Sequence, residues 1–370
     1  MPLNYKKKYV IAASIINGIL YIPLKIVSSF FLIKQHNTKR KILIQDGYRL
    51  GDIIMMSRVL FNLKASFRDA EIHFISSPDA CSLLAHCRWV DKLIVYKAPW
   101  AFGCGIVSPV IYFISAAFKI SSERYSMAID FQGDPRGAAL LYLSGIPVRY
   151  SLNDFHASAF CTKTWNLPKQ LVHQVLRYEY LLEMITSSKL PEFEYPLWPQ
   201  QNMDNQKDFK YQKMKPLIII HPGASFKERR WSSTNFASLI KLCADNNLDV
   251  ILIGSTHDVP LIHEIIEKTN LQITFKTPSF SELEYLLQIS DFVVCNDSFA
   301  AHASWACHKK TVILFGPGNP HQVAPFTGNS FILWNNKVLT APFDQWTGVA
   351  DIDTNQADTV FKTIKNNLAV

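Results

Sequence analysis

The stretch LIIIHPG, residues 217–223, is a run of four apolar residues that ends at a turn-forming Pro-Gly pair. The same form recurs downstream in DVILIGS (249–255), DFVVCND (291–297) and TVILFGP (311–317). Helical spacing is present between these runs at 234–246, 258–268 and 299–307, with SELEYLLQIS at 281–290. Apolar strands that alternate with helices are typical of a parallel sheet covered on both faces. Residues 217–370 are therefore predicted to form an α/β domain.

A second alternation of the same kind precedes this domain. Strands are predicted at 41–45, 70–76, 92–96 and 126–133, and helices at 51–67, 79–87 and 137–144. Residues 191–216 are rich in Pro, Gln, Asn and Lys, which indicates an interdomain linker. The predicted organisation is a basic apolar segment at 1–40, a first α/β domain at 41–190, a linker at 191–216 and a second α/β domain at 217–370.

The formal net charge of +8 is concentrated at the N-terminus. Residues 1–41 contain eight Lys and Arg side chains and no Asp or Glu, so the rest of the chain is formally neutral. A nucleic-acid-binding protein is expected to spread its basic residues over a folded surface, and nucleic acid is therefore excluded as a partner. Basic residues beside an apolar segment indicate a membrane surface with anionic headgroups.

The apolar segment itself covers residues 9–33 and is interrupted by Pro23 and Lys25. Its charge-free part, 9–24, is shorter than the roughly 20 residues that span a bilayer. A cleaved signal peptide is one alternative, but no A-x-A site follows, so we expect a retained membrane-associated helical segment. Because basic residues flank it on both sides, we favour a segment that re-enters or lies along the inner leaflet, with a single span as the alternative.

Several common site types are disfavoured by the sequence. The seven cysteines include no C-x-x-C pair and no two histidines have H-x-x-x-H spacing, which argues against structural zinc and a disulfide framework. There is no G-x-x-x-x-G-K-[ST] stretch and no G-x-G-x-x-G directly after a strand, which argues against P-loop NTPases and Rossmann dehydrogenases. The strand-end loops lack a D-x-D pair, so we expect no divalent metal.

Most side chains capable of chemistry lie in three loops predicted at strand ends, residues 47–52, 221–225 and 296–298. In doubly wound sheets ligands bind outside the carboxyl ends of the strands, where backbone N–H groups can hold an anion. Asp52 and Asp297 could each simply be a helix N-cap, and His302 could be a histidine satisfied within its helix.

Four stretches, taken together and in order, resemble the family 9 glycosyltransferases, the heptosyltransferase-like enzymes of lipopolysaccharide assembly. They are KILIQDGYRLGDIIMMSRVLFNLKASFRDAEIHFI (41–75), SERYSMAIDFQGDPRGAALLYLSGIPVRYS (122–151), HPGASFKERRWSSTNFASLI (221–240) and SELEYLLQISDFVVCNDSFAAHASWACHKKTVILFGPGNPHQVAPF (281–326). Two positions depart from the family pattern, because Phe299 stands where glycine is usual and Ser232 where proline is common.

The resemblance implies a GT-B architecture with two facing Rossmann-like domains, an acceptor domain at 41–190 and a nucleotide-sugar domain at 217–370. It also implies inverting, metal-independent and cofactor-free transfer of a sugar, such as heptose from ADP-heptose. The donor is a nucleotide-diphosphate sugar, and the acceptor is a lipid-linked glycan. The implied location is the cytosolic face of the inner membrane, with peripheral or monotopic attachment.

The resemblance also implies roles for individual residues. Asp52 matches the general base, and its place at a helix start is expected to favour the ionised carboxylate. Arg229 falls where a basic residue binds the diphosphate, with Lys227 and Arg230 as neighbours that could substitute for it. The other implied donor-binding residues are Ser225, Asp258 (at the ribose), Asp297, Ser298 and His302. The implied acceptor-binding residues are Arg49, Asp130 and Gln132, the last two with buried polar support as the alternative.

Two other functions fit the same fold. A nucleotide-sugar epimerase would not need a membrane segment. A non-catalytic glycolipid-binding relative would be expected to have lost either the base or the phosphate-binding charge, yet Asp52 and Arg229 are both present. The sequence therefore favours the transferase.

Overall fold

The computed structural model describes residues 40–45, 49–98, 108–153, 157–191, 196–199, 211–326, 329–339, 341 and 343–368. The predicted membrane-associated segment therefore lies outside the described residues, apart from Arg40. Within the described ranges, every helix is too short or too polar to cross a bilayer. The chain divides into two compact units, Met1–Glu192 and Phe193–Val370, which are described separately below.

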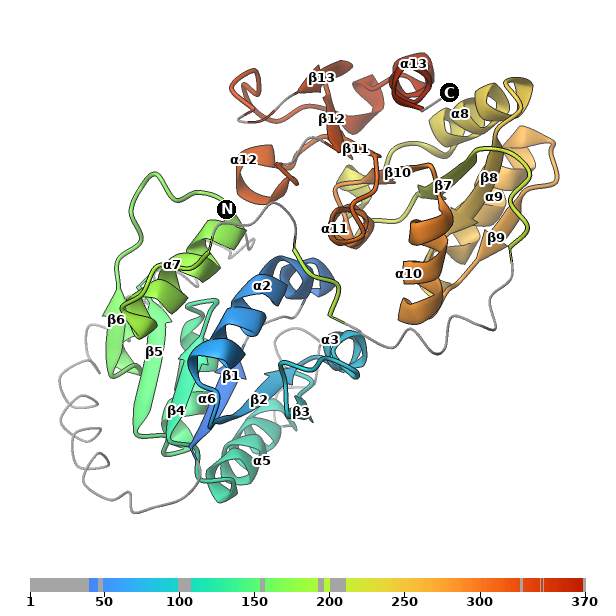
Figure 1. Cartoon of the computed structure of the whole chain (residues 1–370). Helices are drawn as coiled ribbons and strands as arrows, with labels where there is room; N and C mark the ends of the chain where they lie inside the picture. Colours follow the sequence, from blue (N-terminus) through green and yellow to red (C-terminus); the bar gives the residue numbers. More distant parts are fainter. Residues whose placement is uncertain are drawn as a thin grey trace. The chain divides into compact units, whose positions relative to one another are not determined.

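Unit 1 is built on a six-stranded parallel sheet (Figure 1). Its strands are β1 (Lys41–Gln45), β2 (Glu71–Ser76), β3 (Lys92–Val95), β4 (Met127–Asp130), β5 (Val148–Leu152) and β6 (Lys163–Trp165). The strand order is β3-β2-β1-β4-β5-β6, so the chain reverses its direction of travel across the sheet between β1 and β4. Such a switch point is the usual ligand site of a doubly wound sheet.

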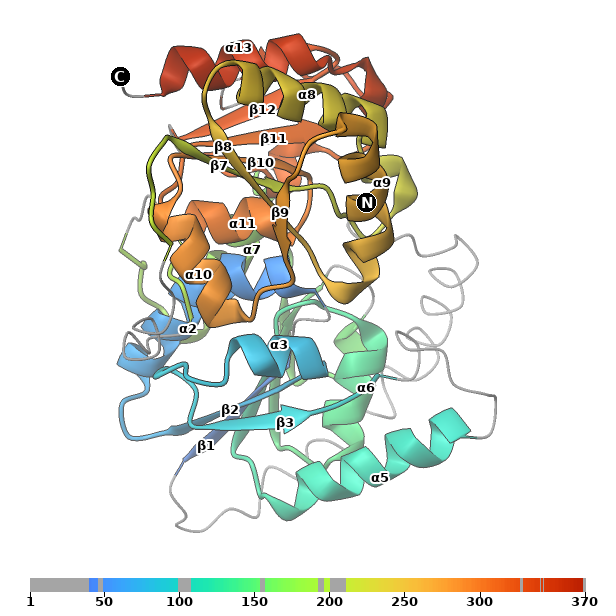
Figure 2. The ribbon, with the colours of Figure 1, turned by 90° about the vertical axis from the view of Figure 1, so that its right-hand side faces the viewer.

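Helices cover both faces of this sheet. They are α2 (Leu50–Ser66), α3 (Pro78–Leu83), α5 (Ser108–Ser122), α6 (Pro135–Leu143) and α7 (Gln174–Thr186), with a 3-10 turn η1 (Ala157–Ala159). Helices α2 and α7 pack together, and α5 packs with α6 (Figures 1 and 2). The α5–α6 side buries Leu43 of β1 and Ala128 of β4, because alternate side chains of a strand point to opposite faces.

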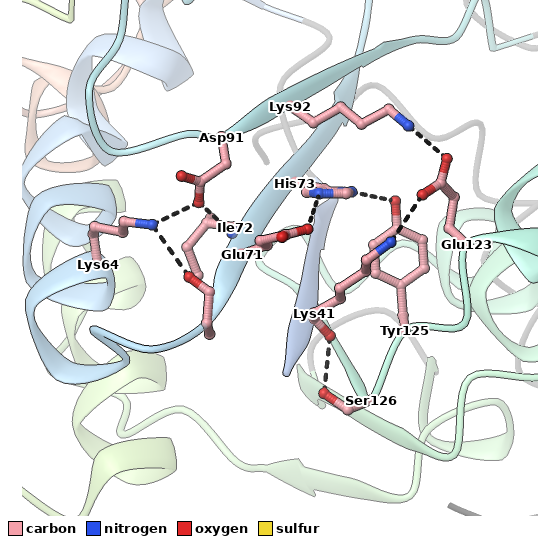
Figure 3. Close-up of polar contacts among 11 residues, drawn as sticks. Lys41, Lys64, Glu71, Ile72, His73, Asp91, Lys92, Glu123, Tyr125 and Ser126 are labelled. Atoms are coloured by element: carbon pink, nitrogen blue, oxygen red, sulfur yellow. Dashed lines mark hydrogen bonds and ion pairs between the residues drawn. The ribbon is translucent and has the colours of Figure 1, made fainter. Parts of the chain in front are cut away.

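A cluster of polar side chains lies at the N-terminal ends of the strands of unit 1, away from the switch-point loops (Figure 3). Glu123, just after α5, accepts hydrogen bonds from Lys41 and Lys92. The buried His73 lies 2.8 Å from the hydroxyl of Tyr125, through its Nδ1 atom. These contacts join the first residue of β1 to the end of α5.

Unit 2 carries a seven-stranded sheet in the order β13-β12-β11-β10-β7-β8-β9. Its strands are β7 (Leu217–His221), β8 (Asp249–Ile253), β9 (Thr274–Lys276), β10 (Phe292–Asn296), β11 (Thr311–Phe315), β12 (Ser330–Trp334) and β13 (Lys337–Leu339). The pairs are parallel except β12–β13, which is antiparallel. Here the switch point falls between β7 and β10.

The helices of unit 2 are α8 (Ser233–Asp245), α9 (Val259–Thr269), α10 (Phe280–Ile289), α11 (Phe299–Ala306), α12 (Pro320–Val323) and α13 (Ala357–Asn367). Short 3-10 turns are η3 (Lys227–Arg229), η4 (Thr256–Asp258) and η5 (Ile352–Thr354). Helices α8, α9 and α13 bury the face of the sheet that carries Ile218, Leu252 and Val294. The central strands β7, β10 and β11 are buried and mainly apolar because helices cover them.

The predicted α/β class with parallel sheets is confirmed, whereas several local predictions need correction. The helix predicted at 79–87 ends at Leu83, and the one predicted from Gly137 begins at Pro135, because Asp134 caps it by accepting a hydrogen bond from the N–H of Arg136. Asp52 is not an N-cap, since Arg49 holds that position before α2. The N-cap alternative for Asp297 is also wrong, since Ser298 precedes α11.

Candidate active site

The loops at the switch point of unit 2 are tied together by the side chain of Asn296. Strands β7 and β10 are parallel neighbours with Cys295 in register with His221, so their carboxyl ends meet. The fully buried amide of Asn296 donates to the carbonyl of Pro222 at 2.8 Å and accepts from the N–H of Trp231 at 3.2 Å. One side chain thereby fixes the loop after β7, the loop after β10 and the residues that follow η3.

Arg229 and Asp297, two predicted donor-binding residues, form an ion pair at this point. Nη1 of Arg229 lies 3.0 Å from Oδ2 of the buried Asp297, while the arginine side chain remains partly exposed. A side chain at Gly318 would come within 2.5 Å of the same carboxylate oxygen, so only glycine allows this approach. A guanidinium has five N–H donors, and the ion pair leaves others for an anion.

The other predicted donor-binding residues differ in their burial and in their contacts. Ser225 is exposed on the loop after β7, and His302 is buried within α11. Oγ of Ser298 lies 3.4 Å from Nδ1 of His221. Burial lowers the pKa of His221, although the charge of Asp258 opposes this effect, and the imidazole is therefore neutral at physiological pH.

Asp258 has a clear structural contact in addition to its predicted role at the ribose. Its Oδ2 accepts hydrogen bonds from the backbone N–H of Ser255 at 2.9 Å and from the hydroxyl at 2.7 Å, and the two residues form a capping box at η4. A side chain at Gly223 would come within 2.5 Å of Oδ1. The carboxylate therefore packs directly against the backbone of the loop after β7.

Asp52 lies in the first turn of α2, where its N–H donates to the carbonyl of Arg49 at 3.1 Å. Burial raises the pKa of its carboxyl from 3.8 to about 6, and the positive charge of Arg49 acts in the opposite direction. The expectation that the helix start dominates is thus corrected, because desolvation outweighs it. A carboxyl with this pKa is still mostly ionised at pH 7 and can accept a proton close to that pH.

Asp130 and Gln132 are brought together in the turn that follows β4. Oδ1 of the fully buried Asp130 accepts from the N–H groups of Gln132 at 3.0 Å and Gly133 at 3.3 Å. Burial raises the pKa of Asp130 to about 8, with a further contribution from the charge of Asp134. Asp130 is therefore mostly protonated at neutral pH and organises the turn, while a role for the pair in acceptor binding stays a prediction.

Three residues at the strand ends were given no role from the sequence, although two of them lie in the loops at 221–225 and 296–298. They are Asn296, His221 and Gln45, of which Gln45 is buried and in register with Asp130 at the switch point of unit 1. Each closes an otherwise apolar run, in FVVCN, LIIIH and KILIQ. A polar side chain that ends a buried strand is the signal that could have found them, because buried polar groups need partners.

Two doubly wound parallel sheets, each with polar side chains gathered at its switch point, define a GT-B type α/β protein. The chain belongs to glycosyltransferase family 9 (heptosyltransferase), which it matches over residues 115–346, more than half of its length. It is therefore a glycosyltransferase. The matched range includes all the predicted donor-binding residues, whereas Arg49 and Asp52 precede it.

Individual relatives agree with this assignment. The chain is 25% identical over 317 residues to lipopolysaccharide heptosyltransferase 2 of Escherichia coli (strain K12), covering 79% of this chain and 87% of that protein. The solved structure of E. coli ADP-heptose lps heptosyltransferase II has a TM-score of 0.71 at 21% identity, covering 89% of this chain and 98% of that one. A family 9 glycosyltransferase from Veillonella parvula DSM 2008 has a TM-score of 0.73 at 17% identity, covering 89% and 97%. These two structures share the fold.

Proposed function

We propose that this glycosyltransferase moves a heptose from ADP-heptose to a lipid-linked glycan of the lipopolysaccharide core, with inversion and without a metal ion. The single observation that carries the proposal is the ion pair of Arg229 with Asp297 at the unit 2 switch point. It holds a partly exposed guanidinium beside strand-end loops of the kind that bind phosphates. The relatives named above support heptose as the sugar and ADP as the nucleotide.

In the proposed reaction, Asp52 takes the proton from an acceptor hydroxyl as that oxygen attacks the anomeric carbon of the donor. The bond from that carbon to the diphosphate oxygen breaks in the same step, so the configuration inverts. The leaving diphosphate carries negative charge, which Arg229 stabilises. A carboxyl whose pKa burial raises to about 6 is suited to this task, because it is ionised at pH 7 yet basic enough to accept the proton.

The donor assignment can be tested by thermal shift with ADP-heptose, UDP-, GDP- and CMP-sugars in buffer that contains excess EDTA. A ligand at about 100 times its Kd adds about 2.7 kcal/mol of stability, so the true donor should raise Tm clearly. We expect ADP-heptose to do so, and to be turned over in EDTA when acceptor is present. Strict dependence on Mg²⁺ or Mn²⁺ would contradict metal-free transfer. Conversion of a UDP-sugar without acceptor would favour the epimerase.

We also propose that the enzyme works at the cytosolic face of the inner membrane and is held there by residues 1–40. The support is the sequence of this segment, which combines a 25-residue apolar run with basic flanks. Deletion of residues 1–36 should move the protein to the soluble fraction and leave transfer to a water-soluble acceptor analogue intact. Loss of transfer to that analogue would assign the segment to the catalytic fold instead.

A further inference from the structure

Helix α5 of unit 1 has apolar residues on two sides. Its inner side buries Ala117 and Ile120 against Leu140 and Leu141 of α6. Its outer side exposes Phe118 by 75%, Ile111 by 64% and Ile114 by 45%. An amphipathic helix at a protein surface normally exposes polar residues on its outer side. The exposed apolar residues of α5 therefore indicate a surface that binds a partner.

The three exposed side chains form one stripe. At about 100° per residue, positions 111, 114 and 118 lie within about 60° of one another around the helix axis. Tyr112 extends the surface towards β3, since its ring stacks on Tyr96 at 5.5 Å between centroids and its hydroxyl accepts from the N–H of Lys97 at 3.2 Å. Single exposed apolar residues are ordinary on soluble proteins, whereas a contiguous stripe marks an interaction site.

The surroundings of this stripe are basic. Lys97, Lys119 and Arg124 are exposed on or beside α5. The sequence from 92 to 129 contains one acidic residue, Glu123, and its carboxylate is occupied by Lys41 and Lys92 (Figure 3). The partner of the α5 stripe should therefore combine an apolar interior with negative charge around it.

The end of α5 lies next to the start of β1. Nζ of Lys41, the first residue of β1, lies 3.3 Å from Oε2 of Glu123 directly after α5, so β1 begins beside the end of this helix. Figure 2 shows α5 along the outer edge of unit 1, in turquoise. In the sequence, residues 1–41 contain eight positive charges and no negative ones.

We propose that the outer stripe of α5, formed by Ile111, Ile114 and Phe118, inserts into the surface of a bilayer that contains anionic lipids. Apolar side chains flanked by Lys and Arg are the chemistry of an interfacial helix. A second copy of the same face is disfavoured because like charges would meet, and so is coverage by residues 1–39, whose flanks are equally basic. This extends the proposed membrane location to a second attachment point in the folded domain.

The test places the photo-reactive residue p-benzoylphenylalanine in place of Phe118 in the full-length protein. The protein is irradiated with vesicles of phosphatidylcholine alone or with vesicles that also contain about 40% phosphatidylglycerol, which gives the surface a negative charge. The matched control carries the probe at Met214, which is 78% exposed in unit 2. A second variant combines the probe at 118 with Ile111→Glu and Ile114→Glu, both at exposed positions where the fold should tolerate them.

We expect lipid adducts at position 118 with the anionic vesicles, few adducts with phosphatidylcholine alone, and few at position 214. The two glutamates should lower the adduct yield about tenfold, because they remove apolar contact and add repulsion. An unchanged yield would overturn the proposal, since tethering by residues 1–40 would then explain the adducts. Crosslinks to residues 1–39 or to a second copy instead of lipid would also overturn it. No sugar transfer is needed, so failure here would leave the proposed reaction standing.

Discussion

The carboxyl groups at the two switch points are held in different ways. In unit 1, burial raises the pKa of Asp52 to about 6 and that of Asp130 to about 8. In unit 2, Asp297 is buried against the guanidinium of Arg229 at 3.0 Å, and Asp258 accepts two hydrogen bonds from Ser255. Two sheets with the same strand order around the switch point therefore hold their carboxyl groups in different surroundings.

This difference suits the two units to different steps of the proposed reaction. A carboxyl with a raised pKa can accept a proton near neutral pH, whereas a guanidinium fixed by a buried carboxylate offers N–H donors to an anion without having to be ordered first. Proton acceptance in unit 1 and diphosphate binding in unit 2 are the two steps that the proposed reaction needs. The predictions below test each side of the comparison.

The largest effect is expected for Asp52→Asn. The amide cannot accept the acceptor proton, so turnover should fall by about 10²- to 10⁴-fold while donor affinity changes little. Because burial disfavours the charged form, the variant should be at least as stable as the wild type. Steady-state kinetics, donor titration and a thermal melt are the measurements. Turnover at the wild-type rate would remove Asp52 from the mechanism.

Arg229→Ala should weaken donor binding and turnover together by about 10- to 100-fold, because a charge-assisted hydrogen bond contributes about 1.5–3 kcal/mol. Calorimetric titration with the nucleotide and kcat/KM measure the two effects. Lys227→Ala, an exposed lysine in the same 3-10 turn, is the matched control and should bind normally.

Arg230 provides a second comparison for this site. Its Nε donates to the carbonyl of Ala224 at 2.8 Å, so it supports the loop after β7. If Arg230→Ala abolished donor binding and Arg229→Ala did not, the diphosphate-binding role would belong to Arg230.

The acid limb of the pH profile of kcat/KM should lie near pH 6, the value to which burial raises the pKa of Asp52. Arg49→Gln removes the charge that lowers this pKa, so the limb should move to higher pH. Activity should then fall a few-fold at pH 6, at a rough estimate, and change little at pH 8. Lys64→Gln, at the other end of α2, should leave the limb in place. Coincident profiles for wild type and Arg49→Gln would argue against coupling between the two residues.

A separate prediction concerns stability instead of turnover and is made for Asp130→Asn. The pKa of Asp130 in the folded protein, about 8, lies above its ordinary value of 3.8, so the protonated group's contribution is complete below about pH 4 and is lost as the pH rises towards 8. The variant does not titrate. Its free energy of unfolding should therefore increase relative to the wild type between pH 4 and 8, by at most about 1.4 kcal/mol for each pH unit. Urea unfolding of both proteins at pH 5 and pH 8 measures this difference in the free energy of unfolding. An equal difference at the two pH values would mean that Asp130 is already ionised at pH 5.

Much of the fold followed from apolar runs that alternate with helical spacing. Strands β1, β2, β4, β7, β8, β10 and β11 were predicted because buried parallel strands have a continuous apolar sequence. Strand β5 was missed because VRYSL mixes polar and apolar residues, and α5 was missed because SPVIYFISAAFKISS is largely apolar and has exposed as well as buried apolar residues. Both segments depend on contacts that are distant in sequence.

The sequence by itself determined the class of the fold, the family resemblance and the residue types available at the strand ends. The tertiary structure decided how those residues are used, because pKa values and ion pairs depend on burial and on neighbours far along the chain. Arg229 and Asp297 are 68 positions apart and meet only through the pairing of β7 with β10. Asp52 and Asp297 are both aspartates near a helix start, yet desolvation raises the pKa of Asp52, whereas Asp297 is buried in an ion pair with Arg229. Desolvation and pairing, which a linear pattern does not contain, separate them.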